Sequence, residues 1–138
     1  ILKKKILTLI SKFKMHKMIK LKNFVENPYP ILKQSELFIL TSKFEGLPNV
    51  LLESIVLKKD IISSDCETGP KEILDNGKGG IIFKTGDHIE LAEKIRSFSK
   101  NKLKYKKKKI FANKRLDRFD YYYNLDLYLR MILKELKF

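Results

Sequence analysis

The sequence contains one cysteine and no tryptophan, and only six glycines and four prolines among 138 residues. A single cysteine, Cys66, cannot form an internal disulfide, so a reducing compartment is expected. So little glycine and proline excludes a collagen-like or repetitive chain, and a hydrophobic fraction of 43% excludes a disordered one. No apolar run approaches the roughly 18 residues that a membrane-spanning helix needs. The chain therefore has the composition and size of a single globular domain.

Acidic residues are scarce in two segments of the chain, whose charges of +8 and +11 together exceed the formal net charge of +14 because the residues between them are acidic. Residues 1–22 hold eight lysines and no acid, and residues 94–118 hold twelve basic residues against Asp117 alone. Residues 23–93 carry twelve acids against seven lysines. A nucleic-acid groove would need basic residues interleaved with aromatics along the site itself. The distribution favours lysines that keep the exposed sides of helices in water or that contact anionic lipid headgroups. It argues against nucleic acid as a ligand.

Hydrophobic periodicity predicts helices and strands in alternation. The expected helices cover 1–13, 31–35, 48–57, 69–74, 89–97, 101–118 and 120–136, and the expected strands cover 18–24, 37–40, 61–64 and 79–83. This alternation is typical of a parallel sheet with right-handed crossovers, so the predicted fold class is α/β, with the sheet layered between helices. Four strands are few for such a domain. The N-terminus reads like the inside of a helix without an initiating Met, and both features lead us to expect a longer protein.

The chain between the buried strand 37–40 and the following helix is the best candidate for chemistry. In open parallel sheets, ligands bind beyond the carboxyl ends of the strands, near helix N-termini. Gly46 lacks a Cβ, so a ligand can approach its backbone closely. Because Pro48 has no amide hydrogen, donors to a diphosphate or to sugar hydroxyls would come from Leu47, Asn49 and Val50. A carboxylate at Glu53 can accept from both hydroxyls of a vicinal diol such as ribose.

Each of these features alone is common in purely structural roles, but their order along the chain is more specific. The stretch Ser42–Ser54 resembles the E-x(7)-E signature of the family 4 (Group 1) glycosyltransferases, with Glu45 and Glu53 as the two glutamates. Further blocks resemble the same family in the same order, at 23–28, 35–40, 59–66, 68–74, 80–83 and 86–87. The similarity covers about residues 18–98, whereas the basic and terminal helices of 99–138 fit loosely. Asp60 stands where the family commonly has proline, and no position matches the family's diphosphate-binding Arg and Lys.

The resemblance implies a Rossmann-like C-terminal lobe of a GT-B enzyme, with residues 1–138 as one domain and the N-terminal acceptor lobe absent. It implies a retaining transfer that needs no metal and no cofactor. Glu45 is the catalytic candidate: we favour donor positioning over a nucleophilic role. The turn at 65–72 is expected near the donor cleft. The remaining implied contacts are the donor sugar or phosphate on Gly46, Leu47, Asn49 and Val50, the ribose on Glu53, and the base near Phe24 and Val25.

The implied function is transfer of a hexose or N-acetylhexosamine from a nucleotide sugar to a glycan or lipid-linked acceptor, in bacterial surface polysaccharide, lipopolysaccharide or glycoconjugate biosynthesis. The expected location is the cytoplasm, at the inner face of the cytoplasmic membrane where the basic helices touch lipid. Two alternatives stay open. One is a non-catalytic remnant that keeps the fold and at most binds nucleotide, and the other is a basic nucleic-acid-binding module.

Overall fold

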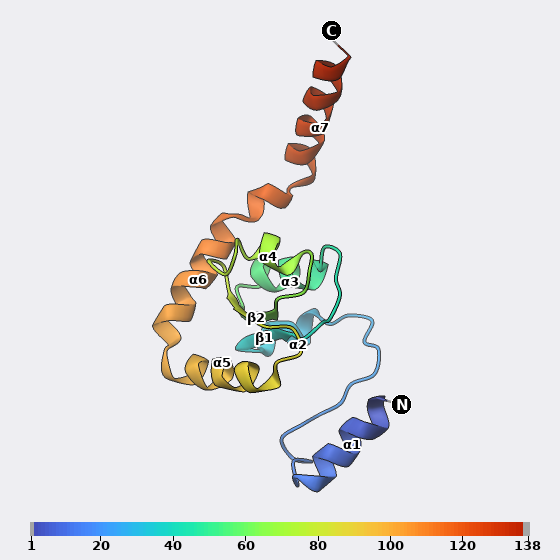
Figure 1. Cartoon of the computed structure of the whole chain (residues 1–138), viewed down its shortest axis with the longest axis vertical. Coiled ribbons are helices and arrows are strands. Elements are labelled where there is room, and N and C mark those ends of the chain that lie inside the picture. Colours follow the sequence, from blue (N-terminus) through green and yellow to red (C-terminus); the bar gives the residue numbers. More distant parts are fainter. Residues whose placement is uncertain (1, 137–138) are drawn as a thin grey trace.

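The computed structural model describes residues 2–136, and it folds around a short parallel sheet (Figure 1). The elements in chain order are α1 (Leu2–Lys12), α2 (Tyr29–Gln34), β1 (Leu37–Leu40), α3 (Asn49–Val56), β2 (Asp60–Ser64), α4 (Pro70–Ile73), β3 (Ile81–Phe83), α5 (His88–Lys100), α6 (Lys102–Lys114), the 3-10 helix η1 (Leu116–Phe119) and α7 (Tyr121–Glu135). Strands and helices alternate from β1 to α5, which confirms the predicted α/β class.

The sheet has the order β1-β2-β3, and both pairs of neighbours run parallel. In the register, Leu37 pairs with Asp60 and Ile62 pairs with Ile81. Successive strand residues point to opposite faces of a sheet. Ile61 and Ile62 are consecutive and only 2% and 0% exposed, so helices cover both faces of β2. This is the arrangement that the continuous apolar runs predict.

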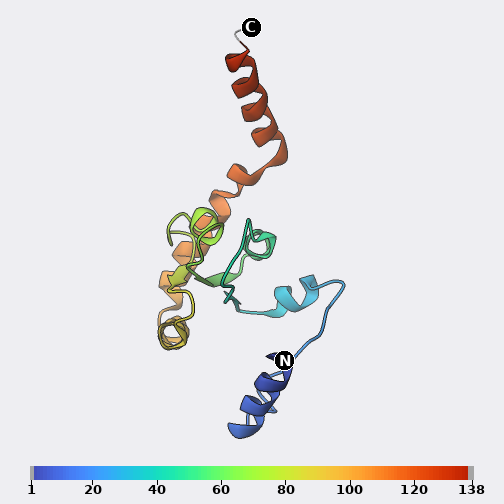
Figure 2. The ribbon, with the colours of Figure 1, turned by 45° about the vertical axis from the view of Figure 1, so that its right-hand side comes forward.

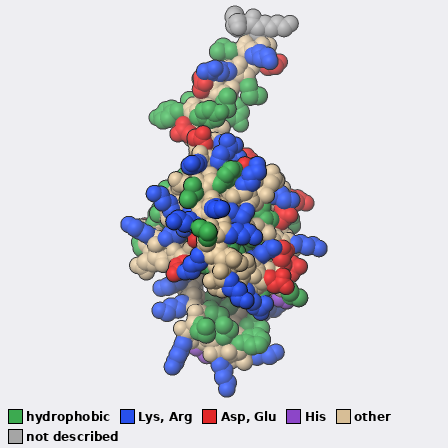
Figure 3. Space-filling model, turned by 90° about the vertical axis from the view of Figure 1, so that its left-hand side faces the viewer, with side chains coloured by type: hydrophobic (Ala, Val, Ile, Leu, Met, Phe, Trp, Pro, Cys, Tyr) green, Lys and Arg blue, Asp and Glu red, His purple; other side chains and the backbone are tan. Residues whose placement is uncertain are grey.

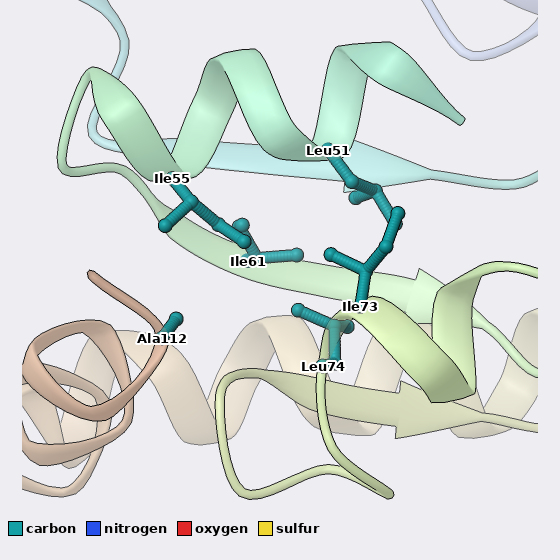
Figure 4. Close-up of a cluster of buried hydrophobic side chains, with 6 residues drawn as sticks. All are labelled: Leu51, Ile55, Ile61, Ile73, Leu74 and Ala112. Atoms are coloured by element: carbon teal, nitrogen blue, oxygen red, sulfur yellow. The ribbon is translucent and has the colours of Figure 1, made fainter. Parts of the chain in front are cut away.

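Two hydrophobic clusters lie on the opposite faces of the sheet. On one face, Leu51 and Ile55 of α3 pack with Ile61 (Figure 4). Ile73 and Leu74 from the α4 region and Ala112 of α6 complete this cluster (Figure 4). On the other face, β2 and β3 pack against α5, and the buried members are Ile62, Phe83, Phe98 and Tyr105. Because Tyr105 and Ala112 belong to different clusters, α6 is anchored to both layers.

The strand expected at 18–24 does not form, and the described residues contain three strands instead of four. This segment is irregular, and it lies with α1 apart from the sheet (Figures 1 and 2). Met18 is 79% exposed and Phe24 is 94% exposed. A strand is stable only when a neighbouring strand pairs with its backbone, and here the outer edge of β1 receives no such pairing. Apolar alternation in the sequence was therefore insufficient to predict a strand.

The C-terminal helices follow the prediction with one correction. Asp87 caps α5 as expected, because its carboxylate accepts hydrogen bonds from the amides of Ile89 and Glu90. The helix expected at 101–118 ends at Lys114 and gives way to η1. Arg118 donates to the carbonyls of Glu72 and Ile73, and this tie to α4 turns the chain. The final helix α7 extends away from the sheet with no buried residue (Figure 1).

None of the helices within residues 2–136 combines the length and the apolar character needed to cross a membrane.

Candidate functional site

The residues between β1 and α3 form a loop at the carboxyl end of β1. The sequence predicts Pro48 in the first turn of α3. Instead, Pro48 has an extended backbone conformation, with φ −72° and ψ 94°, and is the N-cap residue of the helix. Its carbonyl accepts the amide of Leu51 at 2.9 Å. The amides of Asn49 and Val50, at the very start of the helix, meet no acceptor among residues 2–136. They are therefore free to bind an anion, with the positive end of the α3 dipole behind them.

The turn after β2 holds this loop in place. The Ser64 hydroxyl donates to the carbonyl of Ser42 at 2.7 Å, and the Thr68 hydroxyl donates to the carbonyl of Glu45. Gly69 has φ +83°, and a Cβ built on it would lie 2.2 Å from the carbonyl oxygen of Gly46. The turn and the loop thus touch through backbone atoms. The resemblance places the turn at 65–72 near the donor cleft. In the structure this turn contacts the loop between β1 and α3 through the Thr68 hydroxyl and the backbone of Gly69.

We expect Gly69→Ala to destabilise the domain by about 2 kcal/mol or more, since it adds a clash with the loop to the strain of a positive φ. Gly86→Ala is a matched control, because Gly86 also has a positive φ of +84° but a Cβ there meets nothing within 4 Å. This control should lose only about 1 kcal/mol. Urea unfolding of both variants measures the difference. Equal losses in the two variants would show that the close approach at Gly69 contributes nothing.

A shallow pocket of about 370 Å³ opens beside the start of α3. Asn49 and Glu53 lie one turn apart on the helix and line it, and Tyr29 at the start of α2 lines it as well. Leu52, Val56 and Leu57 complete the lining. Tyr29 is 47% exposed, and its amide donates to the Asn27 side chain at 3.1 Å. The pocket therefore combines a carboxylate, an amide side chain and an exposed aromatic ring.

The structure brings some of the predicted site residues together and separates others. Asn49 and Glu53 share the pocket, while Glu45 is half-buried in the loop and does not line it. A Cβ on Gly46 would meet open space, so a ligand has room to approach that backbone. Phe24 and Val25 lie in the irregular segment before α2, outside the pocket.

Two side chains, one in the pocket and one that holds the loop, were not predicted from the sequence. Tyr29 stands in an Asn-Pro-Tyr-Pro stretch, which indicates a loop but gives no sign that the ring lines a pocket. Ser64 is the last residue of β2, and only the fold brings its hydroxyl to Ser42. The Asn-Pro-Tyr-Pro stretch could have signalled an aromatic ring at a helix start, since proline favours the first turn. The Ser64 contact has no local signal at all.

The neighbouring turn carries one further ion pair. Asp65 lies 2.9 Å from the ammonium of Lys71, with both side chains partly exposed. Cys66, between the strand and the turn, is 2% exposed and packs as a small hydrophobic residue. Residues 2–136 contain no group of three or more His, Cys, Asp or Glu side chains arranged to hold a metal ion. The absence of a metal requirement stays a prediction.

Comparisons with known proteins show which family the sequence resembles. The sequence model of a family described as "Glycosyl transferases group 1" matches residues 2–116. An uncharacterized glycosyltransferase of Methanocaldococcus jannaschii is 42% identical over 73 residues, which are 53% of this chain and 18% of that protein. An N-acetylgalactosaminyltransferase of Campylobacter jejuni, whose name specifies a diphospho-undecaprenol acceptor, is 27% identical over 117 residues, or 78% of this chain and 32% of that protein. The chain thus spans a third or less of these relatives.

Among solved structures, HepE of Anabaena in complex with UDP superposes with a TM-score of 0.80 at 17% identity. The match covers 96% of this chain and 36% of HepE. At this identity the likeness concerns the fold alone, and it confirms the predicted Rossmann-like GT-B class.

Proposed function

The chain belongs to the group 1 glycosyl transferases, and from this premise we propose that it is the donor-binding lobe of a retaining glycosyltransferase. The observation that carries the proposal is the start of α3, where two free amides adjoin a pocket lined by Asn49 and Glu53. A nucleoside diphosphate presents a diphosphate and a vicinal diol a few ångströms apart. The amides suit the first group, and the carboxylate suits the second.

Several contacts follow from this placement. Glu53 holds the ribose hydroxyls, while the amides of Asn49 and Val50 take the phosphate. The backbone of Gly46 and Leu47 lies in the same loop and is exposed, which suits it to the sugar or the β-phosphate. Tyr29 lines the same pocket as Glu53 and offers its ring for stacking on the base. Phe24 and Val25 remain proposed base contacts, which requires the segment before α2 to lie closer to the pocket than it does here.

Glu45 is proposed to position the donor sugar. Its carbonyl is fixed by the Thr68 hydroxyl, so the backbone that carries the carboxylate is held while the side chain stays partly exposed. A group fixed in this way lowers the barrier by orientation and by charge placed near the anomeric centre. The leaving phosphate is stabilised by the helix amides, without a metal or a cofactor in the proposed mechanism.

The proposed acceptor is a glycan or a lipid-linked saccharide in bacterial surface polysaccharide assembly, and the proposed sugar is a hexose or N-acetylhexosamine. The C. jejuni relative is named for a diphospho-undecaprenol acceptor, which supports this class. Such acceptors are embedded in a membrane, so we place the enzyme in the cytoplasm at the inner face of the cytoplasmic membrane. The domain assignment is one donor lobe over residues 1–138, with acceptor contacts supplied by another lobe.

We expect the 138-residue chain to bind UDP or GDP with a Kd on the order of 1 mM and to transfer no sugar. The affinity is low because a helix N-terminus binds the diphosphate without the family's Arg and Lys. Isothermal calorimetry with UDP, GDP and their sugar nucleotides measures it, and an assay for sugar released to water or to acceptor measures turnover. Robust transfer by these residues alone would contradict the account. Absence of heat with every nucleotide would favour the remnant interpretation.

A further inference from the structure

The outward face of α6 has features that the donor site does not explain. α6 has the sequence KLKYKKKKIFANK, with no acidic residue. Tyr105 and Ala112 are buried on its inner side, at 2% and 4% exposure. Residues three, four and seven apart share one side of a helix. Leu103, Lys107, Ile110 and Lys114 therefore form a single stripe on the outer side, flanked by Lys106, and Leu103 and Ile110 are 69% and 48% exposed. We name these five residues the α6 stripe.

The lysines of the stripe are not used to hold the fold together. The inner lysines of α6 have partners: Lys109 pairs with Asp60 at 3.1 Å, and Lys108 donates to the carbonyl of Gly77. Lys106, Lys107 and Lys114 form no ion pair within the described residues 2–136. The positive charge of the stripe is therefore free for a partner. Lysine and arginine gather on this side of the molecule around a few apolar side chains (Figure 3).

The surface is also hollowed beside the same stripe. A pocket of about 300 Å³ is lined by Lys106, Ile110 and Lys114 of the stripe together with Lys58, Lys109 and Asn113. Three of its four ammonium groups lack an ion-pair partner within residues 2–136, and the amide of Asn113 donates to the carbonyl of Ile55. The pocket therefore offers mainly apolar surface beside these ammonium groups, which suits the boundary between lipid headgroups and acyl chains.

From these features we infer that the α6 stripe docks on the surface of a bilayer containing anionic phospholipid. Leu103 and Ile110 would enter the headgroup region, and the lysines would reach the phosphates around them. A nucleic acid is the less suitable partner, because bases need exposed aromatic rings to stack on. The two aromatic residues of α6, Tyr105 and Phe111, are buried and half-buried.

The orientation is compatible with the proposed donor site and does not depend on it. α6 runs along the opposite side of the body from the loop between β1 and α3 (Figures 1 and 2). A membrane on the α6 side leaves that loop open. The inference goes beyond the donor site, and vesicle binding can succeed or fail whatever the outcome of nucleotide binding.

Vesicle sedimentation tests the inference with the intact chain. Vesicles of phosphatidylcholine with about 30% phosphatidylglycerol should bind the chain, and vesicles of phosphatidylcholine alone should not. The triple variant Lys106→Glu, Lys107→Glu, Lys114→Glu should lower partitioning at least about tenfold. The matched control is Lys4→Glu, Lys5→Glu, Lys12→Glu on α1, which changes the net charge by the same amount on another lysine-rich helix. It should retain at least half of the binding.

An equal loss in both triple variants would assign binding to overall charge and overturn the role of the stripe. A loss in the α1 variant alone would assign it to α1, and binding to a DNA or RNA oligonucleotide without vesicle binding would replace the lipid by nucleic acid. Contact is measured separately with an environment-sensitive fluorophore on Ile110→Cys, which labels selectively because Cys66 is buried. The emission should shift to the blue on anionic vesicles, whereas a fluorophore on Glu93→Cys of α5 should not respond. No shift at position 110 would contradict the inference.

Discussion

Replacing Glu53 by glutamine is expected to raise the dissociation constant for UDP about 30-fold. A loss of this size is typical when a hydrogen bond to a charged group is removed. The side chain keeps its shape, so the pocket formed with Asn49 and Tyr29 stays intact. What is lost is the carboxylate that accepts from two ribose hydroxyls. Calorimetry or ligand-observed NMR measures the change. Glu93→Gln on α5 removes the same charge from an exposed position remote from the pocket, and it should bind UDP like the unmodified chain.

A second ligand turns this into a test of the ribose contact itself. 2′-Deoxyuridine diphosphate lacks one of the two hydroxyls, so the unmodified chain should bind it more weakly than UDP. Glu53→Gln should distinguish the two ligands less than the unmodified chain does, because glutamine keeps only one acceptor oxygen for the two hydroxyls. If the two changes instead act independently, the variant loses the same factor in affinity for the deoxy ligand as the unmodified chain does. That result would show that Glu53 does not face the ribose. The proposed orientation of the nucleotide would then be wrong.

Tyr105→Ala should have the largest effect on stability, a loss of about 3–5 kcal/mol in the free energy of unfolding. The ring is 2% exposed and packs edge-on against Phe98 with the ring centroids 4.9 Å apart. It belongs to the cluster that joins α6 to β2, β3 and α5. Removing it leaves a cavity where the helix meets the sheet. Urea unfolding followed by circular dichroism measures the loss.

Tyr105→Phe separates the packing of the ring from its hydrogen bond. The hydroxyl donates to the carbonyl of Lys94 at 2.9 Å, and losing this bond should cost about 1 kcal/mol. Burial raises the pKa of Tyr105 above its ordinary value of 10.0. The unfolded chain therefore ionises first, so the contribution of the tyrosine is present below pH 10 and is lost as the pH rises through the folded pKa. The phenylalanine variant should lack this alkaline loss. A loss for Tyr105→Phe as large as for Tyr105→Ala would contradict the packing argument.

The central elements of the fold could be predicted because their signals are local. The apolar run at 37–40 has the length and composition of a buried strand, and Asp87 precedes its helix in the spacing of a cap. The strand expected at 18–24 was wrong for a physical reason. Its pattern is local, but its stability depends on a neighbouring strand, and the apolar alternation alone gives no information about that neighbour. Arg118 likewise ends the basic helix early through contacts to residues more than forty positions away.

In the candidate site, too, the residues close in sequence could be predicted and the contacts between distant segments could not. Glu53, Asn49 and Val50 lie within one helix start, so spacing alone places them together, and the structure agrees. Tyr29 reaches the same pocket from a helix twenty residues upstream, which periodicity does not predict. The contact of Gly69 with Gly46 is equally distant in sequence, and only the parallel order of β1 and β2 brings the two turns together. Local chemistry was predictable, and the contacts between loops were not.

The central claim, that a nucleoside diphosphate binds at the start of α3, is tested most directly by titrating UDP into isotope-labelled chain and following the backbone amide signals by NMR. The account predicts that the amides of Gly46, Leu47, Asn49, Val50 and Glu53 shift together and saturate with one dissociation constant. The lysine-rich α6 should remain unchanged. Shifts confined to α6, or no shift at the α3 residues up to several millimolar UDP, would contradict the account.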